Sequence, residues 1–337
     1  MNLVTGATGI LGIQVMAELL LRGEKVRGLK RVSGDLSTAQ KILAIRTGDE
    51  KAIEKIEWVV GNVLDINSLT DAMRDVDHVY HCAAVVSYHA DDRDDMYEIN
   101  VEGTANVVNV ALELNRPKIC FVSSIAALGK LQKDSWLDEK TEWADSDYNT
   151  HYGITKNLSE MEVWRGIQEG LEAIVVNPGF IIGPGDFKRS SSSVFQKIDE
   201  GMKYYPPGGT GFIGVKDCAS MMISLMKKDI SGERFILVAE NWSMKELFCS
   251  IAQSIGKNIP TREATPTILQ IVRIFEWFKQ FITFRKALIT RETVKNASIR
   301  FYYRNDKVKA TLGQDFQPLQ EAIQDTAQIY RQFEKGL

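Results

Sequence analysis

The stretch Thr5-Gly6-Ala7-Thr8-Gly9-Ile10-Leu11-Gly12 decides the fold of this chain, because of what lies on either side of it. The short apolar run at residues 1–4 predicts a buried strand, and residues 13–21 have the spacing of a helix that stops at Gly23. A strand, a turn paced by glycines and a helix form the phosphate-binding corner of a dinucleotide fold. In that corner the first glycine allows the tight turn, and the second lets N–H groups approach a pyrophosphate. The third lets the helix pack closely on the strand.

The spacing of these glycines, G-x-x-G-x-x-G, differs from the commoner G-x-G-x-x-G and is a weak signal when it stands alone. The alternative is an ordinary glycine-rich turn between a strand and a helix. The position of the motif directly after a first strand favours the dinucleotide site.

The bulk composition is that of a globular protein. The 337 residues, 44% of them apolar and 25% charged, suffice for one large α/β unit or for a nucleotide domain with a smaller lobe. A net charge of −3 gives no case for nucleic-acid binding. The sequence holds no apolar run long enough for a transmembrane segment, and a strand that begins at Met1 leaves no room for a targeting peptide. Because the cysteines form no C-x-x-C pair, we expect a reduced cytoplasmic protein with buried thiols and no metal site; the cysteines are Cys82, Cys120, Cys218 and Cys249.

Short apolar runs alternate with helical patterns through the first two-thirds of the chain. Further strands are predicted at residues 25–30, 56–60, 77–82, 118–123, 171–176 and 234–238. Helical patterns cover residues 68–74 and 101–114, and the longer connection at 33–55 predicts two short helices. This alternation predicts an α/β, doubly wound Rossmann fold with a parallel seven-stranded sheet and helices on both faces.

The texture of the sequence changes after Gly183, where glycine, proline and serine become frequent, and the chain beyond Ala239 reads as largely helical. We expect residues 1–183 and 215–240 to form the dinucleotide-binding domain. Residues 184–214 and 241–337 are expected to form a smaller, mainly helical substrate lobe.

One pair of polar residues can carry chemistry. Tyr152 and Lys156 are four residues apart, so they share one face of a predicted helix. By itself this spacing is common on helix surfaces. Here Ser123 and Ser124 end the predicted strand before it, and the carboxyl ends of parallel strands face the nucleotide crevice. A serine hydroxyl and the Tyr152 phenol can therefore meet over a nicotinamide.

Taken together, these motifs resemble the extended short-chain dehydrogenase/reductase family, which includes nucleotide-sugar epimerases and dehydratases. The resemblance runs from residue 3 to about residue 240 and continues weakly to the end. Its elements stand in family order: Gly6, Gly9 and Gly12; His81-Cys82-Ala83-Ala84; Asn100 to Thr104; Ser123-Ser124; Tyr152 and Lys156; Asn177-Pro178-Gly179; and Gly183-Pro184.

The resemblance implies a role for each catalytic motif. Tyr152 would exchange a proton with the substrate oxygen, with its pKa lowered by Lys156, and Ser124 would hydrogen-bond the same oxygen. Asn100 would either support a proton relay or make a structural hydrogen bond. A small-molecule substrate and a homodimer are implied as well. The cofactor-binding residues would be Gly6, Thr8, Gly9, Ile10, Leu11, Gly12, Lys30, Arg31, Asn62, Val63, Ala83, Ala84, Ser123, Tyr152, Lys156, Pro178 and Gly179.

Two basic residues indicate which dinucleotide is bound. Lys30 and Arg31 stand eighteen and nineteen residues beyond Gly12, where an enzyme that uses NAD carries an acid for the ribose 2′-hydroxyl. A guanidinium there can instead bind the 2′-phosphate of NADP. We therefore expect NADP, with NAD possible because Asp35 is close by and the basic pair can also be solvent-facing.

The same family motifs narrow the reaction. The run Ser124-Ile125-Ala126 lacks the acids that sugar dehydratases carry at this site, and Asn177-Pro178 differs from the Arg-Pro of sugar epimerases. The chain looks closest to the branch of dihydroflavonol reductases and 3β-hydroxysteroid dehydrogenases. This predicts NADPH-linked reduction of a ketone or aldehyde on a small to medium, largely apolar substrate. A nucleotide-sugar epimerase with tightly bound cofactor, or a non-catalytic NADP sensor, are the alternatives.

Residues 267–284 are dense in bulky apolar side chains but include charged residues, which excludes a bilayer span. They predict a helix buried in the lobe or at a dimer seam, a lid over the substrate, or an interfacial membrane helix. The basic stretch at 285–309 predicts a solvated face or a clamp for an anionic substrate tail.

Overall fold

The computed structural model describes residues 1–337 except 115, 131, 133, 190, 266, 269, 271–293, 295–297 and 335–337. Most of the aromatic stretch at 267–284 and the first half of the basic stretch at 285–309 lie outside the described residues.

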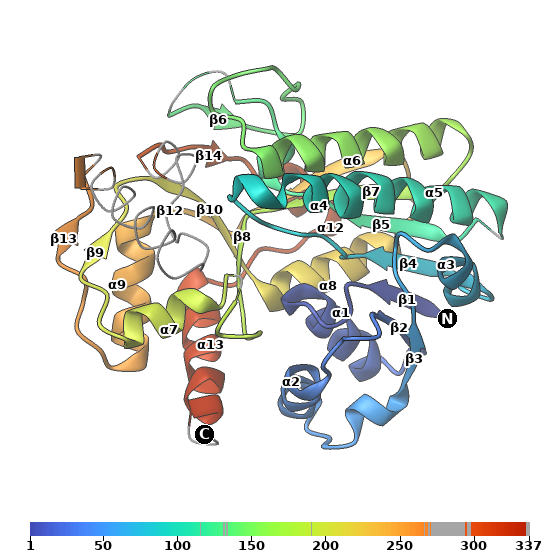
Figure 1. Cartoon of the computed structure of the whole chain (residues 1–337), viewed down its shortest axis with the longest axis horizontal. Coiled ribbons are helices and arrows are strands. Elements are labelled where there is room, and N and C mark those ends of the chain that lie inside the picture. Colours follow the sequence, from blue (N-terminus) through green and yellow to red (C-terminus); the bar gives the residue numbers. More distant parts are fainter. Residues whose placement is uncertain are drawn as a thin grey trace.

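The centre of the molecule is a seven-stranded sheet in which every neighbouring pair is parallel (Figure 1). Its order is β11-β7-β5-β4-β1-β2-β3, so the chain reverses its direction of winding between β1 and β4. That reversal defines a doubly wound sheet with a ligand crevice at the carboxyl ends of the strands. All seven predicted strands are confirmed: β1 (Asn2–Thr5), β2 (Val26–Lys30), β3 (Ile56–Val60), β4 (His78–His81), β5 (Lys118–Val122), β7 (Ala173–Pro178) and β11 (Glu233–Leu237).

Helices cover both faces of this sheet and enclose two separate apolar cores. On one face α1 (Ile10–Leu21) packs against α2 (Ser37–Thr47) and α8 (Val215–Met226), with α12 (Asp306–Leu312) beyond α8. On the other face α5 (Gly103–Glu113) lies between α3 (Ile66–Met73) and α6 (His151–Gln168). The connection at 33–55 holds α2 and the 3₁₀ turn η1 (Ala52–Lys55), as predicted.

The end of the first helix shows how local sequence sets these boundaries. Gly23 has φ of 72°, a left-handed conformation that suits a residue without a Cβ. Its N–H donates to Leu20 over 3.0 Å, and the Glu24 N–H donates to Leu19 over 3.0 Å. This pair of bonds satisfies two terminal carbonyls and ends α1 where the sequence predicted.

A smaller sheet lies beside the large one, with the order β12-β10-β8. Its strands are β8 (Phe180–Ile182), β10 (Gly209–Gly214) and β12 (Glu240–Ser243). A third core joins it to α7 (Ser193–Asp199), α9 (Met244–Ile255) and α13 (Leu319–Glu334). Two short pairs complete the strands, β9 (Tyr204–Tyr205) with β13 (Arg262–Glu263) and β6 (Trp136–Leu137) with β14 (Tyr302–Tyr303). The sequence did not predict these short strands, because two residues are too few to show an apolar run or an alternation.

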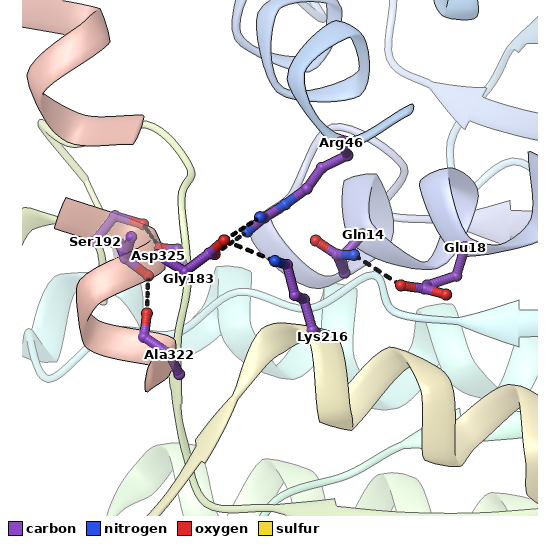
Figure 2. A network of polar contacts seen from close by, with 9 residues as sticks. Gln14, Glu18, Arg46, Gly183, Ser192, Lys216, Ala322 and Asp325 are labelled. Carbon is purple, nitrogen blue, oxygen red and sulfur yellow. Dashed lines mark hydrogen bonds and ion pairs between the residues drawn. The ribbon is translucent and has the colours of Figure 1, made fainter. Parts of the chain in front are cut away.

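One network of charges ties the C-terminal helix α13 to α2 and α8, two helices on one face of the large sheet (Figure 2). The carboxylate of Asp325 on α13 accepts two hydrogen bonds from the Arg46 guanidinium on α2, at 2.8 and 2.7 Å. It accepts a third from the Lys216 ammonium on α8, at 2.7 Å. Because the Arg46 side chain is only 5% exposed, its charge depends on Asp325 for compensation.

Replacing Asp325 tests this network. Burial raises the pKa of its carboxyl, but the hydrogen bonds and charges of Arg46 and Lys216 outweigh burial and hold it below the ordinary 3.8. We expect Asp325→Asn to lower the free energy of unfolding by about 2 kcal/mol at neutral pH. Because the native pKa is depressed, this contribution is present above the ordinary value and is lost as the pH falls through the native one.

Chemical denaturation of both proteins at neutral and acidic pH measures the difference. The control is Asp315→Asn, because Asp315 pairs with Lys309 in an exposed position and its loss is expected to change stability by less than about 0.5 kcal/mol. Equal effects of the two substitutions would contradict the assigned role of Asp325.

Candidate active site

The glycine turn between β1 and α1 is built from backbone contacts. Gly6 has φ of 63°, and a Cβ there would lie 2.7 Å from the backbone nitrogen of Ala83. A Cβ on Gly12 would lie 2.3 Å from the carbonyl oxygen of Gly6. The fold itself therefore requires glycine at both positions. Gly9 differs, because it is exposed and its added Cβ would meet the Gly6 carbonyl oxygen at 3.2 Å.

The N-terminus of α1 opens on the same turn. Its N-cap is Gly9, which has no side chain to bind the free N–H groups of the first turn. Uncapped N–H groups, the positive end of the helix dipole and a surface without side chains suit a phosphate ligand. This cradle fits the pyrophosphate of a dinucleotide. Thr8 is exposed beside it, whereas Leu11 points into the core and can offer only its backbone.

The carboxyl end of β2 carries the basic pair predicted to read the dinucleotide. Lys30 is the last residue of β2, and Arg31 is exposed beyond it. The nearby Asp35 carboxylate accepts from the backbone and hydroxyl of Ser37, at 2.9 and 2.6 Å, at the start of α2. Asp35, the acid that follows the basic pair in the sequence, is thus engaged with its own helix.

Asn62 and Val63, which follow β3, were predicted to bind the cofactor. The side-chain oxygen of Asn62 accepts from the backbone of Leu64 at 3.2 Å. Val63 is buried, and its carbonyl oxygen accepts from Asn106 at 3.1 Å. The Asn62 side chain therefore holds the turn before α3, whereas the Val63 side chain packs in an apolar core.

The catalytic candidates meet where α6 begins. Thr150 caps the helix by accepting from the Gly153 N–H at 2.9 Å. A Cβ on Gly153 would lie 2.5 Å from the carbonyl oxygen of Ala126, so glycine lets α6 lie directly against the 3₁₀ turn η4 (Ile125–Ala127). Ser124 is the N-cap of that turn. The close approach brings the Ser124 hydroxyl into a hydrogen bond with the Tyr152 phenol.

The phenol of Tyr152 is held in its protonated form. Burial raises its pKa above the ordinary 10; the hydrogen bond with Ser124 lowers the value by less, and Tyr88 adds to the rise. The sequence predicted a lowered value through Lys156. Desolvation disfavours the phenolate and outweighs such an effect in the structure. A protonated phenol is the form that a proton donor needs.

Lys156 is a buried ammonium without a hydrogen-bond partner among the described residues. It is 1% exposed, and its Nζ lies 4.3 Å from the ring centroid of Phe121. Burial lowers its pKa to about 7, against the opposing effect of Glu160. Such an orphaned donor is costly unless a ligand completes it. The ribose hydroxyls of a nicotinamide nucleotide supply acceptors of the required kind.

Ser123 and Asn100 are engaged elsewhere. The Ser123 hydroxyl donates to the buried carboxylate of Glu160, which leaves Ser124 as the serine beside Tyr152. Asn100 lies in the π-helix η3 (Glu98–Glu102), just before α5, and is fully buried. Its amide binds both backbone groups of Val85, at 2.8 and 3.0 Å, and the Thr155 hydroxyl at 3.0 Å. These bonds support the structural alternative for Asn100, which clips the segment after β4 to α6.

The remaining predicted contacts lie along the carboxyl ends of β4 and β7 and the start of α1. The Ala83 N–H donates to the Thr5 hydroxyl at 3.3 Å, and Ala84 follows it beside the glycine turn. Pro178 ends β7, and the Gly179 N–H donates to the Leu237 carbonyl at 2.9 Å. Ile10 begins α1 near Gly185. The structure therefore gathers at one edge of the sheet residues that are up to 173 positions apart in the chain.

Sequence reasoning missed three polar side chains behind this edge: Glu160 and His81, which are buried, and Arg234, which is partly buried. Glu160 is fully buried and pairs with Arg234. His81 bridges the Thr5 hydroxyl at 2.7 Å and the Thr104 hydroxyl at 3.1 Å, and burial followed by Lys156 lowers its pKa to about 3. The position of Glu160, one helical turn beyond Lys156 on the same face, was the available signal.

Asn177, which the sequence analysis used to distinguish the branches of the family, is buried behind the candidate site. Its side-chain nitrogen donates to the Ser124 carbonyl at 2.8 Å and to Glu160 at 2.7 Å. The amide thus supports the site from behind, and its bearing on the substrate is indirect.

Comparison with known proteins assigns the family. Residues 2–237 match the NAD dependent epimerase/dehydratase family. Sterol demethylase protein B of Methylococcus capsulatus is 29% identical over 277 residues, which are 82% of this chain and 80% of that protein. A putative dihydroflavonol 4-reductase of Synechocystis sp. is 26% identical, covering 97% of this chain and 94% of its own. Cinnamoyl-CoA reductase 1 of Oryza sativa subsp. japonica is 30% identical, covering 70% of both chains.

Solved structures agree with this assignment. The crystal structure of gox2253 superposes with a TM-score of 0.80 at 29% identity, covering 99% of this chain and 98% of that one. The dTDP-glucose 4,6-dehydratase DesIV from Streptomyces venezuelae, solved with NAD and TYD bound, has a TM-score of 0.77 at 18% identity, covering 99% of this chain and 98% of its own. The second likeness concerns the fold alone.

The chain therefore belongs to the NAD dependent epimerase/dehydratase family. It is an NAD(P)-dependent enzyme of the extended short-chain dehydrogenase/reductase type, which confirms the resemblance of its motifs. Among the residues that the structure describes, no helix is both long enough and apolar enough to cross a membrane.

The glycine turn yields a matched pair of substitutions. We expect Gly9→Ala to fold with nearly unchanged thermal stability but to bind NADPH about tenfold or more weakly, because its methyl group projects into the phosphate cradle. Gly12→Ala is expected to destabilise the whole protein by several kcal/mol, since its methyl group overlaps the Gly6 carbonyl. Fluorescence titration with NADPH and thermal unfolding separate the two effects. Loss of stability in Gly9→Ala without loss of binding would contradict the assignment.

Proposed function

We propose that the protein reduces a ketone or aldehyde carbonyl on a small to medium, largely apolar substrate with NADPH. The observation that carries this proposal is the hydrogen bond between Ser124 and a protonated Tyr152, one helical turn from the unpartnered ammonium of Lys156. A proton donor, a hydroxyl beside it and a free cation are what a carbonyl needs when it becomes an alcohol.

Each residue has a defined task in this reaction. The nicotinamide supplies the hydride when it is bound. The Ser124 hydroxyl binds the carbonyl oxygen of the substrate, and Tyr152 donates its phenolic proton to that oxygen. Lys156 holds the nicotinamide ribose, and its positive charge stabilises the phenolate that remains. The reverse reaction would use the same phenolate as the base.

NADPH is favoured over NADH by the end of β2. Neither Lys30 nor Arg31 forms an ion pair with a described residue, and the Asp35 carboxylate is turned to Ser37. An unpaired guanidinium at this edge can bind a 2′-phosphate by two parallel hydrogen bonds. Because Ser37 binds the Asp35 carboxylate, Asp35 is not free to bind the ribose 2′-hydroxyl of NADH.

The surroundings of Ser124 support a carbonyl substrate without a sugar nucleotide. The turn after it contributes Ile125 and Ala126 and no acid, and Leu128 and Phe301 belong to the apolar cluster beside it. Relatives carry the names dihydroflavonol 4-reductase and cinnamoyl-CoA reductase.

Epimerisation of a nucleotide sugar is the second candidate, favoured by the name of the matching family. We assign residues 184–214 and 241–337 to the substrate lobe, with the exception of α12, which packs on the large sheet.

Two further features of the proposal concern the setting of the enzyme. Four cysteines without a disulfide support a reducing compartment, and we place the enzyme in the cytoplasm.

On α6, the exposed Ile154, Leu158 and Met161 form one stripe, at intervals of four and three residues. Tyr97, at the end of α4 (Arg93–Tyr97), is exposed as well, and α4 contacts α6. We propose that a second copy of the chain covers this stripe.

Tyr152→Phe tests the reaction. We expect kcat for NADPH-dependent reduction of aldehydes and ketones to fall at least 100-fold, because the proton donor is gone, while the dissociation constant for NADPH changes less than threefold. Initial rates across a carbonyl panel and fluorescence titration measure both. Unchanged turnover in this variant would overturn the mechanism, and isomerisation of a UDP- or GDP-sugar without carbonyl reduction would replace the function.

The same assays test cofactor choice. Arg31→Ala is expected to raise KM for NADPH about tenfold and to leave KM for NADH nearly unchanged, since only NADPH carries the 2′-phosphate. Equal effects on both cofactors would show that Arg31 does not read this phosphate.

Leu158→Glu tests the homodimer. A charge in the centre of the apolar stripe is expected to shift the sedimentation mass from twice that of the chain to that of one chain, with little change in thermal stability of the subunit. A wild-type protein that sediments as a monomer would refute this part of the proposal.

A further inference from the structure

The buried carboxylate of Glu160 stands behind the catalytic candidates. It lies on α6, four residues after Lys156 and eight after Tyr152, and it is fully inaccessible to solvent. A carboxylate buried so completely is unfavourable unless several donors compensate its charge. Its partners therefore show what the group is doing in the fold.

Three donors, each from a different strand or strand end, meet this carboxylate. Ser123 follows β5 and donates its hydroxyl to Oε1 of Glu160. Asn177 on β7 donates its side-chain nitrogen to the same oxygen at 2.7 Å. Arg234 on β11 donates from its guanidinium to Oε2. One buried group thereby joins α6 to three neighbouring strands of the large sheet.

The two donors to Oε1 also fix the backbone around Ser124. Ser123 is its chain neighbour, and the Asn177 nitrogen uses its other hydrogen to bind the Ser124 carbonyl oxygen at 2.8 Å. Through Ser123 and Asn177, Glu160 thus fixes the backbone on both sides of the Ser124 side chain and so the position of its hydroxyl. Tyr152 is carried by the helix to which Glu160 belongs. The relative position of the serine and the phenol therefore depends on one carboxylate.

Glu160 is also the charged group that faces Lys156. The other titratable groups against this ammonium are His81 and Cys82, at and just after the end of β4, and β5 contributes the ring of Phe121. Burial lowers the pKa of His81 to about 3 and raises that of Cys82 to about 12, so both are neutral near pH 7. Within the described residues, the charge of Glu160 is what supports a protonated Lys156.

We propose that Glu160 is a positioning residue of the active site: bound by Ser123, Asn177 and Arg234, its carboxylate holds Ser124 in place beside Tyr152 and provides the negative charge that faces Lys156. The proposal rests on the proposed function for the tasks of these residues. In this proposal Glu160 has two effects: it sets the position of Ser124, and its charge favours protonated Lys156. A residue that only stabilised the fold would not have the second effect.

Glu160→Gln separates the charge from the shape. Because the charged Lys156 is the form that binds the ribose, we expect the affinity of the wild-type protein for NADPH to fall as the pH rises through the pKa of Lys156. Without the carboxylate this step moves to lower pH, and at neutral pH NADPH binds about tenfold more weakly. With a carbonyl substrate, kcat is expected to fall at least tenfold while KM for that substrate changes little.

Two variants calibrate the experiment. Glu162→Gln, on the same helix, removes a partly exposed carboxylate that pairs with Arg165 at 3.0 Å, and it is expected to match the wild-type protein in all readouts. Lys156→Met is expected to abolish the pH step in NADPH binding, which assigns the step to that ammonium. A Glu160→Gln protein that loses thermal stability but keeps the wild-type pH step and kcat would overturn the positioning role.

If Glu160→Gln does not fold, Ser123→Ala carries the test. It keeps the charge and removes one donor, so kcat is expected to fall about threefold or more with the pH step in place, and an unchanged kcat would overturn the geometric part. The NADPH titration requires no carbonyl substrate. If Glu160→Gln shifts the pH step in NADPH binding but the wild-type protein reduces no carbonyl, the proposed function is refuted and the charge role of Glu160 stands. If the wild-type protein reduces carbonyls but Glu160→Gln leaves the pH step unshifted, the proposed function stands and the charge role of Glu160 is refuted.

Discussion

The active-site edge of this protein depends on backbone lying against backbone. The helix α1 approaches the glycine turn so closely that a methyl group on Gly12 would overlap the carbonyl of Gly6. The helix α6 approaches the turn after β5 in the same way, with Gly153 against Ala126. Both contacts lie at the carboxyl ends of parallel strands, where a doubly wound sheet opens its crevice. Any side chain between these elements would push α1 away from the glycine turn or Tyr152 away from Ser124.

The close approach of α6 to the sheet also explains how the charges of Lys156 and Glu160 come to be buried. With α6 pressed against the sheet, water is excluded from Lys156 and Glu160, and each charge must be met by a specific partner. Glu160 receives three donors from three strands. Lys156 has no hydrogen-bond partner among the described residues, so a ligand that supplied an acceptor would satisfy it.

A large part of the fold could be predicted from the sequence, because the central strands β1, β4, β5 and β7 are buried on both faces and read as short apolar runs. The stop of α1 at Gly23 and the two helical segments of residues 33–55 were predictable from local signals of the same kind. The short strands β6, β9, β13 and β14 were not, since two-residue pairings depend on which distant segment lies alongside. The π-helix that holds Asn100 was not predicted either. The Asn100 side chain bonds to Val85 and Thr155, which are far from it along the chain, and local sequence does not show such contacts.

By itself, the sequence determined that a dinucleotide corner, a serine, a tyrosine and a lysine occur in one order within a doubly wound sheet, because spacing and alternation are local properties of the chain. The tertiary structure alone decided which of the two serines faces the tyrosine, since the Ser123 hydroxyl is bound by Glu160. It also decided that burial raises the pKa of Tyr152 and that Asn177 lies behind the site. These outcomes depend on desolvation and on contacts between residues far apart in the chain, and neither is encoded in the spacing of a motif.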